Sequence, residues 1–258
     1  MKSKFFYLVE IQYLGFRYHG WAIQPEVNTV QRMVERTLRY VLDGAKFKVL
    51  ITGRTDALVS ANQSYFELFL DDPIEIDSFL VKFNENLPAD IRALSIEEVG
   101  KEFNVINDPK TKEYTYLFSY GQKNHPFAAP YMCCLLGELD IELMKQGAKL
   151  LEGEHDFINF AYKPKEDTVT RRSIDSAEIV ANDMMTASFF PEKSYVFKVR
   201  GKGFMRHQVR IMMGCLINLG RGDITLEEMQ ALIDAKEHNP VTYVAPASGL
   251  MLNAVSFK

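Results

Sequence analysis

The order of strand-like and helix-like apolar patterns in the first hundred residues constrains the fold more than any other feature of the sequence. Apolar side chains alternate along residues 5–13, 46–51, 63–70 and 93–99, a pattern that predicts strands. They recur at helical spacing from Asn28 or Thr29 to Asp43-Gly44, and again after Asp77, which we expect to cap a helix ending at Leu87-Pro88. The resulting order, β-α-β-β-α-β, is typical of a ferredoxin-like unit.

The remaining residues again predict a mixture of strands and helices. We expect strands over residues 114–120, 176–180, 184–190 and 195–199, a helix capped by Asp140, a long helix over 204–219, and a last helix opened by the capping box Thr225–Glu228. The fold class is therefore α+β, with two ferredoxin-like or RRM-like halves, residues 1–105 and 106–258. We expect them to share a continuous mixed, mainly antiparallel sheet flanked by helices, with a central positively charged cleft.

Charge is distributed unevenly along the chain. The formal net charge of −4 argues against a general nucleic-acid binder, because phosphate contacts need Lys and Arg. Residues 193–222 nevertheless carry basic side chains and no acidic one; these are Lys193, Lys198, Arg200, Lys202, Arg206, Arg210 and Arg221. Such a segment is either a focused polyanion site or a solvated basic face.

Several classes of protein are disfavoured by the sequence. Cys133, Cys134 and Cys215 have no CxxC spacing and no nearby histidine at ligand spacing, so we expect buried thiols and no metal site. The stretch from Met1 to Lys4 enters the first strand without the apolar block of a secretory signal. The longest apolar stretch, residues 211–220, is too short to span a bilayer. We therefore expect a cytoplasmic protein without a membrane segment.

The five residues Gly53-Arg54-Thr55-Asp56-Ala57 connect two predicted strands. Catalytic groups are common on such connections, because a rigid sheet fixes the loop while its backbone can bend toward a ligand. Taken alone, the five residues also fit a solvated turn with a local Arg/Asp pair.

Six further motifs accompany this loop in a fixed order along the whole chain. The seven are Tyr18-His19-Gly20-Trp21 with Gln24 and Val30-Gln31; Gly53-Arg54-Thr55-Asp56-Ala57 with Val59, Ala61 and Gln63; Lys110 with Tyr114 and Tyr116; Gly153-Glu154-His155-Asp156-Phe157; Gly203-Phe204-Met205-Arg206-His207-Gln208-Val209-Arg210; Gly214 with Leu219-Gly220-Arg221-Gly222; and Ala245-Pro246 with Gly249-Leu250. With these motifs the chain resembles the tRNA pseudouridine synthase A family.

The resemblance implies an isomerase that converts uridine to pseudouridine in the anticodon stem-loop of tRNA, at tRNA positions 38–40. It implies no metal and no organic cofactor, and a homodimer as the working form. Asp56 matches the catalytic aspartate of the family. Its carboxylate adds to the ring, attacks C1′ or abstracts the 2′ proton, and the sequence leaves these three routes open.

The resemblance also assigns supporting roles. Arg210 matches the arginine that pairs with the aspartate, Tyr114 the tyrosine that stacks on the target base, and Arg54 an arginine that helps expel the nucleotide from its stem. We expect RNA contacts from Arg54 and from the basic segment with its histidine, namely Lys198, Arg200, Lys202, Arg206, His207 and Arg221. Plainer alternatives are a core tyrosine for Tyr114 and a local ion pair with Asp56 for Arg54.

The chain departs from the family pattern beside the aspartate, in the first loop and before Tyr114. Leu58 and Ser60 stand where the family has glycine and histidine, Leu14 replaces an acid, and Ile106 and Glu113 replace basic residues. These changes predict altered or weakened tRNA recognition. The alternatives are therefore a synthase acting on a different RNA, or a catalytically silent RNA-binding or folding module.

Overall fold

The computed structural model describes residues 4–108, 110–234 and 239–257. Residues 1–3, which entered the argument about a secretory signal, lie outside this range. The chain forms two compact units: Met1–Pro109 together with Leu252–Lys258, and Lys110–Met251. The ranges expected from the sequence, 1–105 and 106–258, put the boundary four residues earlier and assigned the last residues to the second half.

The first unit is built on antiparallel strands. β1 (Phe5–Tyr13) pairs with β3 (Ser60–Leu70) on one side and β4 (Ile91–Glu98) on the other, and β2 (Phe47–Ile51) pairs with β3. The last strand, β10 (Leu250–Phe257), also lies next to β3. A strand distant in sequence thus completes the first unit.

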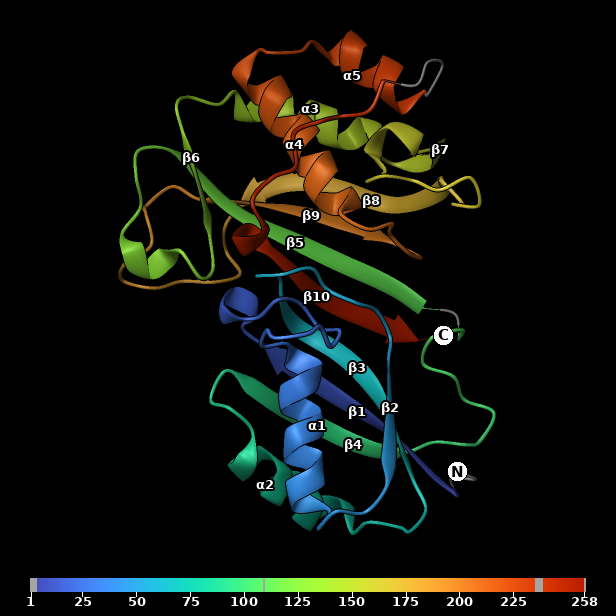
Figure 1. The fold of residues 1–258 in the computed structure, drawn as a ribbon. Coiled ribbons are helices and arrows are strands. Elements are labelled where there is room, and N and C mark those ends of the chain that lie inside the picture. The colour runs from blue at the N-terminus through green and yellow to red at the C-terminus, as the bar shows by residue number, and fades with distance from the viewer. Residues whose placement is uncertain (1–3, 109, 235–238, 258) are drawn as a thin grey trace. The chain divides into compact units, whose positions relative to one another are not determined.

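Two helices cover one face of these strands. α1 (Val30–Val41) and α2 (Ile76–Asn86) contact each other, and α1 crosses in front of the strands in Figure 1. Of the alternating positions in β1, Tyr7, Val9, Ile11 and Tyr13 are buried and Phe5 is half-buried. Val34 and Leu38 of α1 and Phe83 of α2 are buried as well. The β-α-β-β-α-β order is confirmed for this unit.

The second unit has strands in the order β5 (Lys110–Gly121), β9 (Tyr195–Gly201), β8 (Arg171–Ala181) and β7 (Gly153–Asp156), all antiparallel. β6 (Cys133–Leu136) pairs with β5 in parallel. Its helices are α3 (Ile141–Leu150), α4 (Gln208–Arg221) and α5 (Leu226–Ile233), and α3 contacts both α4 and α5 (Figure 1). The α+β class and the mixed, mainly antiparallel strand pairing are confirmed.

Three sequence predictions of secondary structure were wrong. The cap of α2 is Glu75, whose carboxylate accepts hydrogen bonds from the N–H groups of Asp77 and Ser78; Asp77 lies inside the first turn. Residues 184–190 form turns instead of a strand. The side chain of Asn182 accepts hydrogen bonds from the N–H groups of Met184 and Met185. Such local bonding competes with the backbone bonds of a strand.

The third correction concerns the start of α4. The sequence predicted helix from Phe204, whereas α4 begins at Gln208. His207 has a left-handed backbone (φ 60°), and the Gln208 side chain accepts a hydrogen bond from the N–H of Met205 at 2.8 Å. Residues 204–207 therefore form a loop, which places Phe204 against β5.

No helix in the described ranges is long and apolar enough to cross a membrane.

Candidate active site

Asp56 lies on the loop that connects β2 with β3 and is half-buried. A second loop, which carries Tyr18, Gly20 and Trp21, lies against it. The N–H of Leu58 donates to the carbonyl of Tyr18 (3.0 Å), and the N–H of Trp21 donates to the carbonyl of Thr55 (3.3 Å). These two bonds fix the backbone on both sides of Asp56.

Gly20 explains why the second loop can come so close. Its φ of +82° is in the left-handed region, and a Cβ at this position would lie 2.5 Å from the carbonyl oxygen of Thr55. Trp21 anchors the same loop from inside, because its ring is buried next to the rings of Tyr13 and Phe66. The motif Tyr18–Trp21 thus acts as a support for the Asp56 loop.

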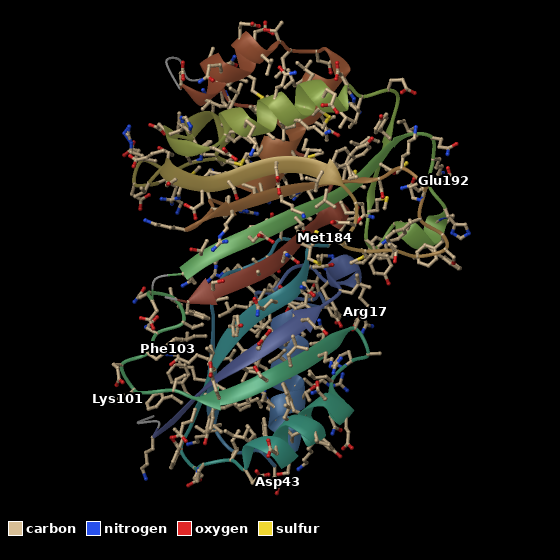
Figure 2. The ribbon with its side chains drawn as sticks, turned by 180° about the vertical axis from the view of Figure 1, so that it is seen from behind. Arg17, Asp43, Lys101, Phe103, Met184 and Glu192 are labelled. Atoms are coloured by element: carbon tan, nitrogen blue, oxygen red, sulfur yellow. The ribbon has the colours of Figure 1, made fainter. Side chains whose placement is uncertain are left out.

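A polar network fixes the outer end of this support. Arg17 binds Asp90 with two nitrogens, one of them at 2.8 Å, and the hydroxyl of buried Tyr18 donates to Asp90 at 2.7 Å. Burial, and then the hydrogen bond to Asp90, raises the pKa of Tyr18. Burial alone would raise the pKa of Asp90, but the bonds from Arg17 and Tyr18 lower it below its ordinary value. Arg17 itself lies at the surface (Figure 2).

Ser60 and Leu58, two departures from the family pattern, have different roles. Ser60 is buried, and its hydroxyl accepts a hydrogen bond from the N–H of Gly15 at 2.9 Å. A Cβ on Gly15 would lie 2.0 Å from the carbonyl oxygen of Val59. Ser60 therefore joins the two loops from inside. Leu58 is 39% exposed and has a left-handed φ of 68°, a conformation that favours glycine.

Arg54 is exposed on the same loop, and it forms no ion pair with Asp56 or with any other residue of the described ranges. The alternative of a local Arg/Asp pair thus finds no support.

Tyr114 belongs to the second unit, where it projects from β5. The ring of Phe204 meets it edge-on, with the centroids 5.3 Å apart. Lys112 shares this face of the strand, because side chains two residues apart point the same way. Burial, with a further contribution from Lys110, lowers the pKa of Lys112 to about 8. An aromatic ring and a partly desolvated lysine thus point to the same face of β5.

Arg210, in the first turn of α4, is held by the segment around Ala245. Its Nε donates to the carbonyl of Ala245 (2.8 Å), and the N–H of Ala245 donates back to the carbonyl of Arg210 (3.1 Å). The hydroxyl of Tyr116 donates to the next carbonyl, that of Pro246, at 2.8 Å. The structure thereby joins Arg210 to β5 through the Ala245-Pro246 motif.

The residues of the basic segment that were predicted to bind RNA are spread over β9, α4 and the loops beside them. Directly opposite residues of antiparallel strands share a face, and Tyr114 is opposite Val199, whereas Lys198 is opposite Thr115 and Arg200 is opposite Glu113. Lys198 and Arg200 therefore point away from the Tyr114 face.

Four other predicted positions lie outside β9. Lys202 lies in the loop after β9. Arg221 ends α4, eleven residues after Arg210 and thus roughly 16 Å along the helix axis. Its guanidinium lies over the ring of Tyr243. Only Arg206 and His207 lie directly before α4, and both contact Tyr162, a residue that the sequence analysis did not select. The network of Tyr18 with Arg17 and Asp90 was also missed, because no local pattern signals a contact between loops so far apart in sequence.

His155 is held by contacts with its own neighbours in the chain. Its Nε2 lies 2.7 Å from the carbonyl oxygen of Glu152, and its ring meets Phe157 edge-on. Within the described ranges, no group of three or more His, Cys, Asp or Glu side chains could hold a metal ion.

The chain is similar to known proteins over nearly its whole length. A family model described as tRNA pseudouridine synthase matches residues 148–258. The chain is 29% identical to tRNA pseudouridine synthase A of Mycoplasma genitalium, over 98% of both chains. It is 30% identical to tRNA pseudouridine synthase A 2 of Bacillus cereus, over 97% of this chain and 99% of the relative. It is 31% identical to tRNA pseudouridine synthase A of Pelobacter propionicus, over 96% and 97%. The chain therefore belongs to the tRNA pseudouridine synthase A family and is an isomerase that converts uridine to pseudouridine.

Proposed function

We propose that this enzyme acts on uridines in the anticodon stem-loop of tRNA and that the carboxylate of Asp56 carries the reaction. The observation that carries the proposal is the close support of the Asp56 loop by the Tyr18–Trp21 loop, which leaves no room for a side chain at Gly20. A group that must meet one sugar and one base in a fixed geometry needs this kind of support.

The reaction conserves all atoms. The bond between N1 and C1′ breaks, the base turns, a bond between C5 and C1′ forms, and C5 loses a proton while N1 gains one. An ionised carboxylate serves each of the three routes, whether it adds to the ring, attacks C1′ or takes the 2′ proton. We further propose that Arg210 keeps Asp56 ionised and that Tyr114 stacks on the target base.

The test is incubation of the protein with unmodified tRNA, followed by mapping of pseudouridine through its chemical adduct. We expect adducts in the anticodon arm with the native protein and none with Asp56→Asn. Asp43→Asn removes the same charge from an exposed position of the same unit after α1 and should leave turnover unchanged. If adducts formed only in another RNA, that RNA would replace tRNA as the proposed substrate. Substantial turnover by Asp56→Asn would show that the Asp56 carboxylate does not carry the reaction.

We also propose that the enzyme is cytoplasmic and that it works as a homodimer; the dimer is what the resemblance implies. The second unit exposes apolar side chains at Phe127 and Leu136 that a partner could cover. Sedimentation analysis should give twice the mass of one chain, and Phe127→Ser should shift the equilibrium toward monomer if this surface takes part. A single-chain mass at all protein concentrations would contradict the dimer.

A further inference from the structure

The ring of Tyr162 gathers three basic residues in the second unit. Tyr162 follows the short helix η3 (Ile158–Phe160) and is half-buried. The ring centroid of His207 lies 4.4 Å from that of Tyr162, the guanidinium carbon of Arg206 lies 5.3 Å from it, and Nζ of Lys163 lies 5.5 Å from it. We call these four residues the Tyr162 cluster.

The cluster fixes cations that would otherwise move freely. A tyrosine ring attracts a cation through its quadrupole, so Tyr162 restricts the long side chains of Arg206 and Lys163 to its vicinity. A turn fixes the backbone beyond Lys163, because the N–H of Lys165 donates to the Thr168 hydroxyl at 2.8 Å. Ordering these side chains before a ligand arrives lowers the entropy cost of binding.

The two cations have no carboxylate partner. Arg206 and Lys163 are exposed, and neither forms an ion pair or a hydrogen bond with any residue for which the structure gives a position. In the first unit, by contrast, Arg17 lies over the Tyr18 ring and is paired with Asp90. The Tyr162 cluster therefore presents uncompensated positive charge, which suits a ligand with more than one negative charge.

We propose that the Tyr162 cluster binds backbone phosphates of the RNA next to the target uridine. The proposal rests on the proposed function, because it takes RNA as the substrate. His207 and the two cations already occupy the surroundings of the ring, which favours phosphate binding over base stacking. Arg206 precedes Arg210 by four residues, so the phosphates would belong to nucleotides close to the reacting one.

Matched substitutions test the proposal. Arg206→Gln removes a charge from the cluster, and Arg36→Gln makes the same change at an exposed position of α1 in the first unit. Tyr162→Phe keeps the ring, whereas Tyr162→Leu removes it. Binding is measured by fluorescence anisotropy of a labelled anticodon stem-loop RNA across a salt series, and single-turnover rates are measured at saturating enzyme.

We expect Arg206→Gln and Lys163→Gln to raise the Kd about three- to tenfold and to reduce the salt slope by about one unit each. Arg36→Gln and Tyr162→Phe should bind like the native protein. Tyr162→Leu should weaken RNA binding less in the Arg206→Gln background than in the native protein, because the ring contributes to binding by ordering the Arg206 side chain. The single-turnover rate at saturation should stay within about twofold in all variants.

The possible failures are distinguishable. If the native protein isomerises tRNA but Arg206→Gln binds as well as Arg36→Gln, the proposal is overturned and the proposed function stands. Equal weakening by both would assign the effect to net charge and would also overturn it. If the native protein modifies no tRNA and binds no stem-loop, both proposals fail together.

Discussion

Gly20 lies directly against the carbonyl group of Thr55, and the loop that carries Asp56 depends on this contact. The distance of 2.5 Å from the carbonyl oxygen to a Cβ built on Gly20 is shorter than real Cβ contacts allow, and the obstacle is backbone. No side-chain movement can therefore accommodate a substitution, and the loop itself must shift.

Gly20→Ala should lower activity by at least about a hundredfold, because a displacement of roughly 1 Å near a reacting group has this effect. Gly44→Ala is the matched control: it has a similar φ of +76°, but nothing lies within 4 Å of its Cβ. It should cost about 1 kcal/mol of stability and leave the rate unchanged. Equal rate losses in the two variants would mean that backbone strain, not the contact with Thr55, controls activity.

Asp90→Asn should destabilise the first unit and loosen the Tyr18–Trp21 loop. It weakens the charge-assisted bonds from Arg17 and Tyr18, which contributes about 1–3 kcal/mol. Since the folded-state pKa of Asp90 is lowered, this stability is present above the unfolded pKa of about 3.9 and is lost as the pH falls. Urea unfolding at neutral and acid pH measures it: the difference between native protein and variant should shrink on acidification. A constant difference would contradict the ionic origin.

Leu58→Gly and Ser60→His both restore the family pattern, but we expect the first to change RNA binding and the second to change stability. Leu58→Gly removes the cost of a left-handed backbone at a residue with a Cβ, about 1 kcal/mol, but it also makes the unfolded chain more flexible. The free energy of unfolding should therefore change by less than about 1 kcal/mol. We expect a lower KM for tRNA with an unchanged single-turnover rate, because the RNA backbone can approach more closely. An unchanged or higher KM would mean that Leu58 suits the RNA this enzyme uses.

Ser60→His, by contrast, removes the hydrogen bond to Gly15 and forces a ring into a buried site. It should cost about 1–3 kcal/mol of stability, measured by thermal unfolding. A variant as stable as the native protein would show that the loops can open at this position. Restoring both residues together would thus mix an effect on binding with an effect on folding.

Lys112 should make stability depend on alkaline pH. Its folded-state pKa of about 8 is below the unfolded value of about 10.4, so between these values the unfolded chain binds more protons, and the contribution of Lys112 to stability rises with pH. Lys112→Met should be more stable than the native protein at pH 7, by at most about 3 kcal/mol, and this advantage should shrink as the pH rises from 8 to 10. A difference independent of pH would show that Lys112 titrates normally.

The sequence alone determined the local architecture of the first unit. Apolar periodicity is a property of neighbouring residues, so it located β1, α1 and the strands that flank the Asp56 loop. Caps are equally local: Thr29 and Asp140 accept hydrogen bonds from the first turns of α1 and α3, and Thr225 forms the expected capping box. Where two local signals competed, as for the start of α2 or of α4, the sequence was ambiguous. The side-chain hydrogen bonds of Glu75 and Gln208 mark where these helices begin.

Only the tertiary structure decided which side chains share a surface. Whether Lys198 points with Tyr114 or away from it depends on the register of β9 against β5, and a shift of one residue would reverse it. The bond of Tyr18 to Asp90 and that of Gly15 to Ser60 join segments far apart in the chain. Such contacts form because buried polar groups need partners and backbones need space, and both requirements are met only when the whole unit has folded.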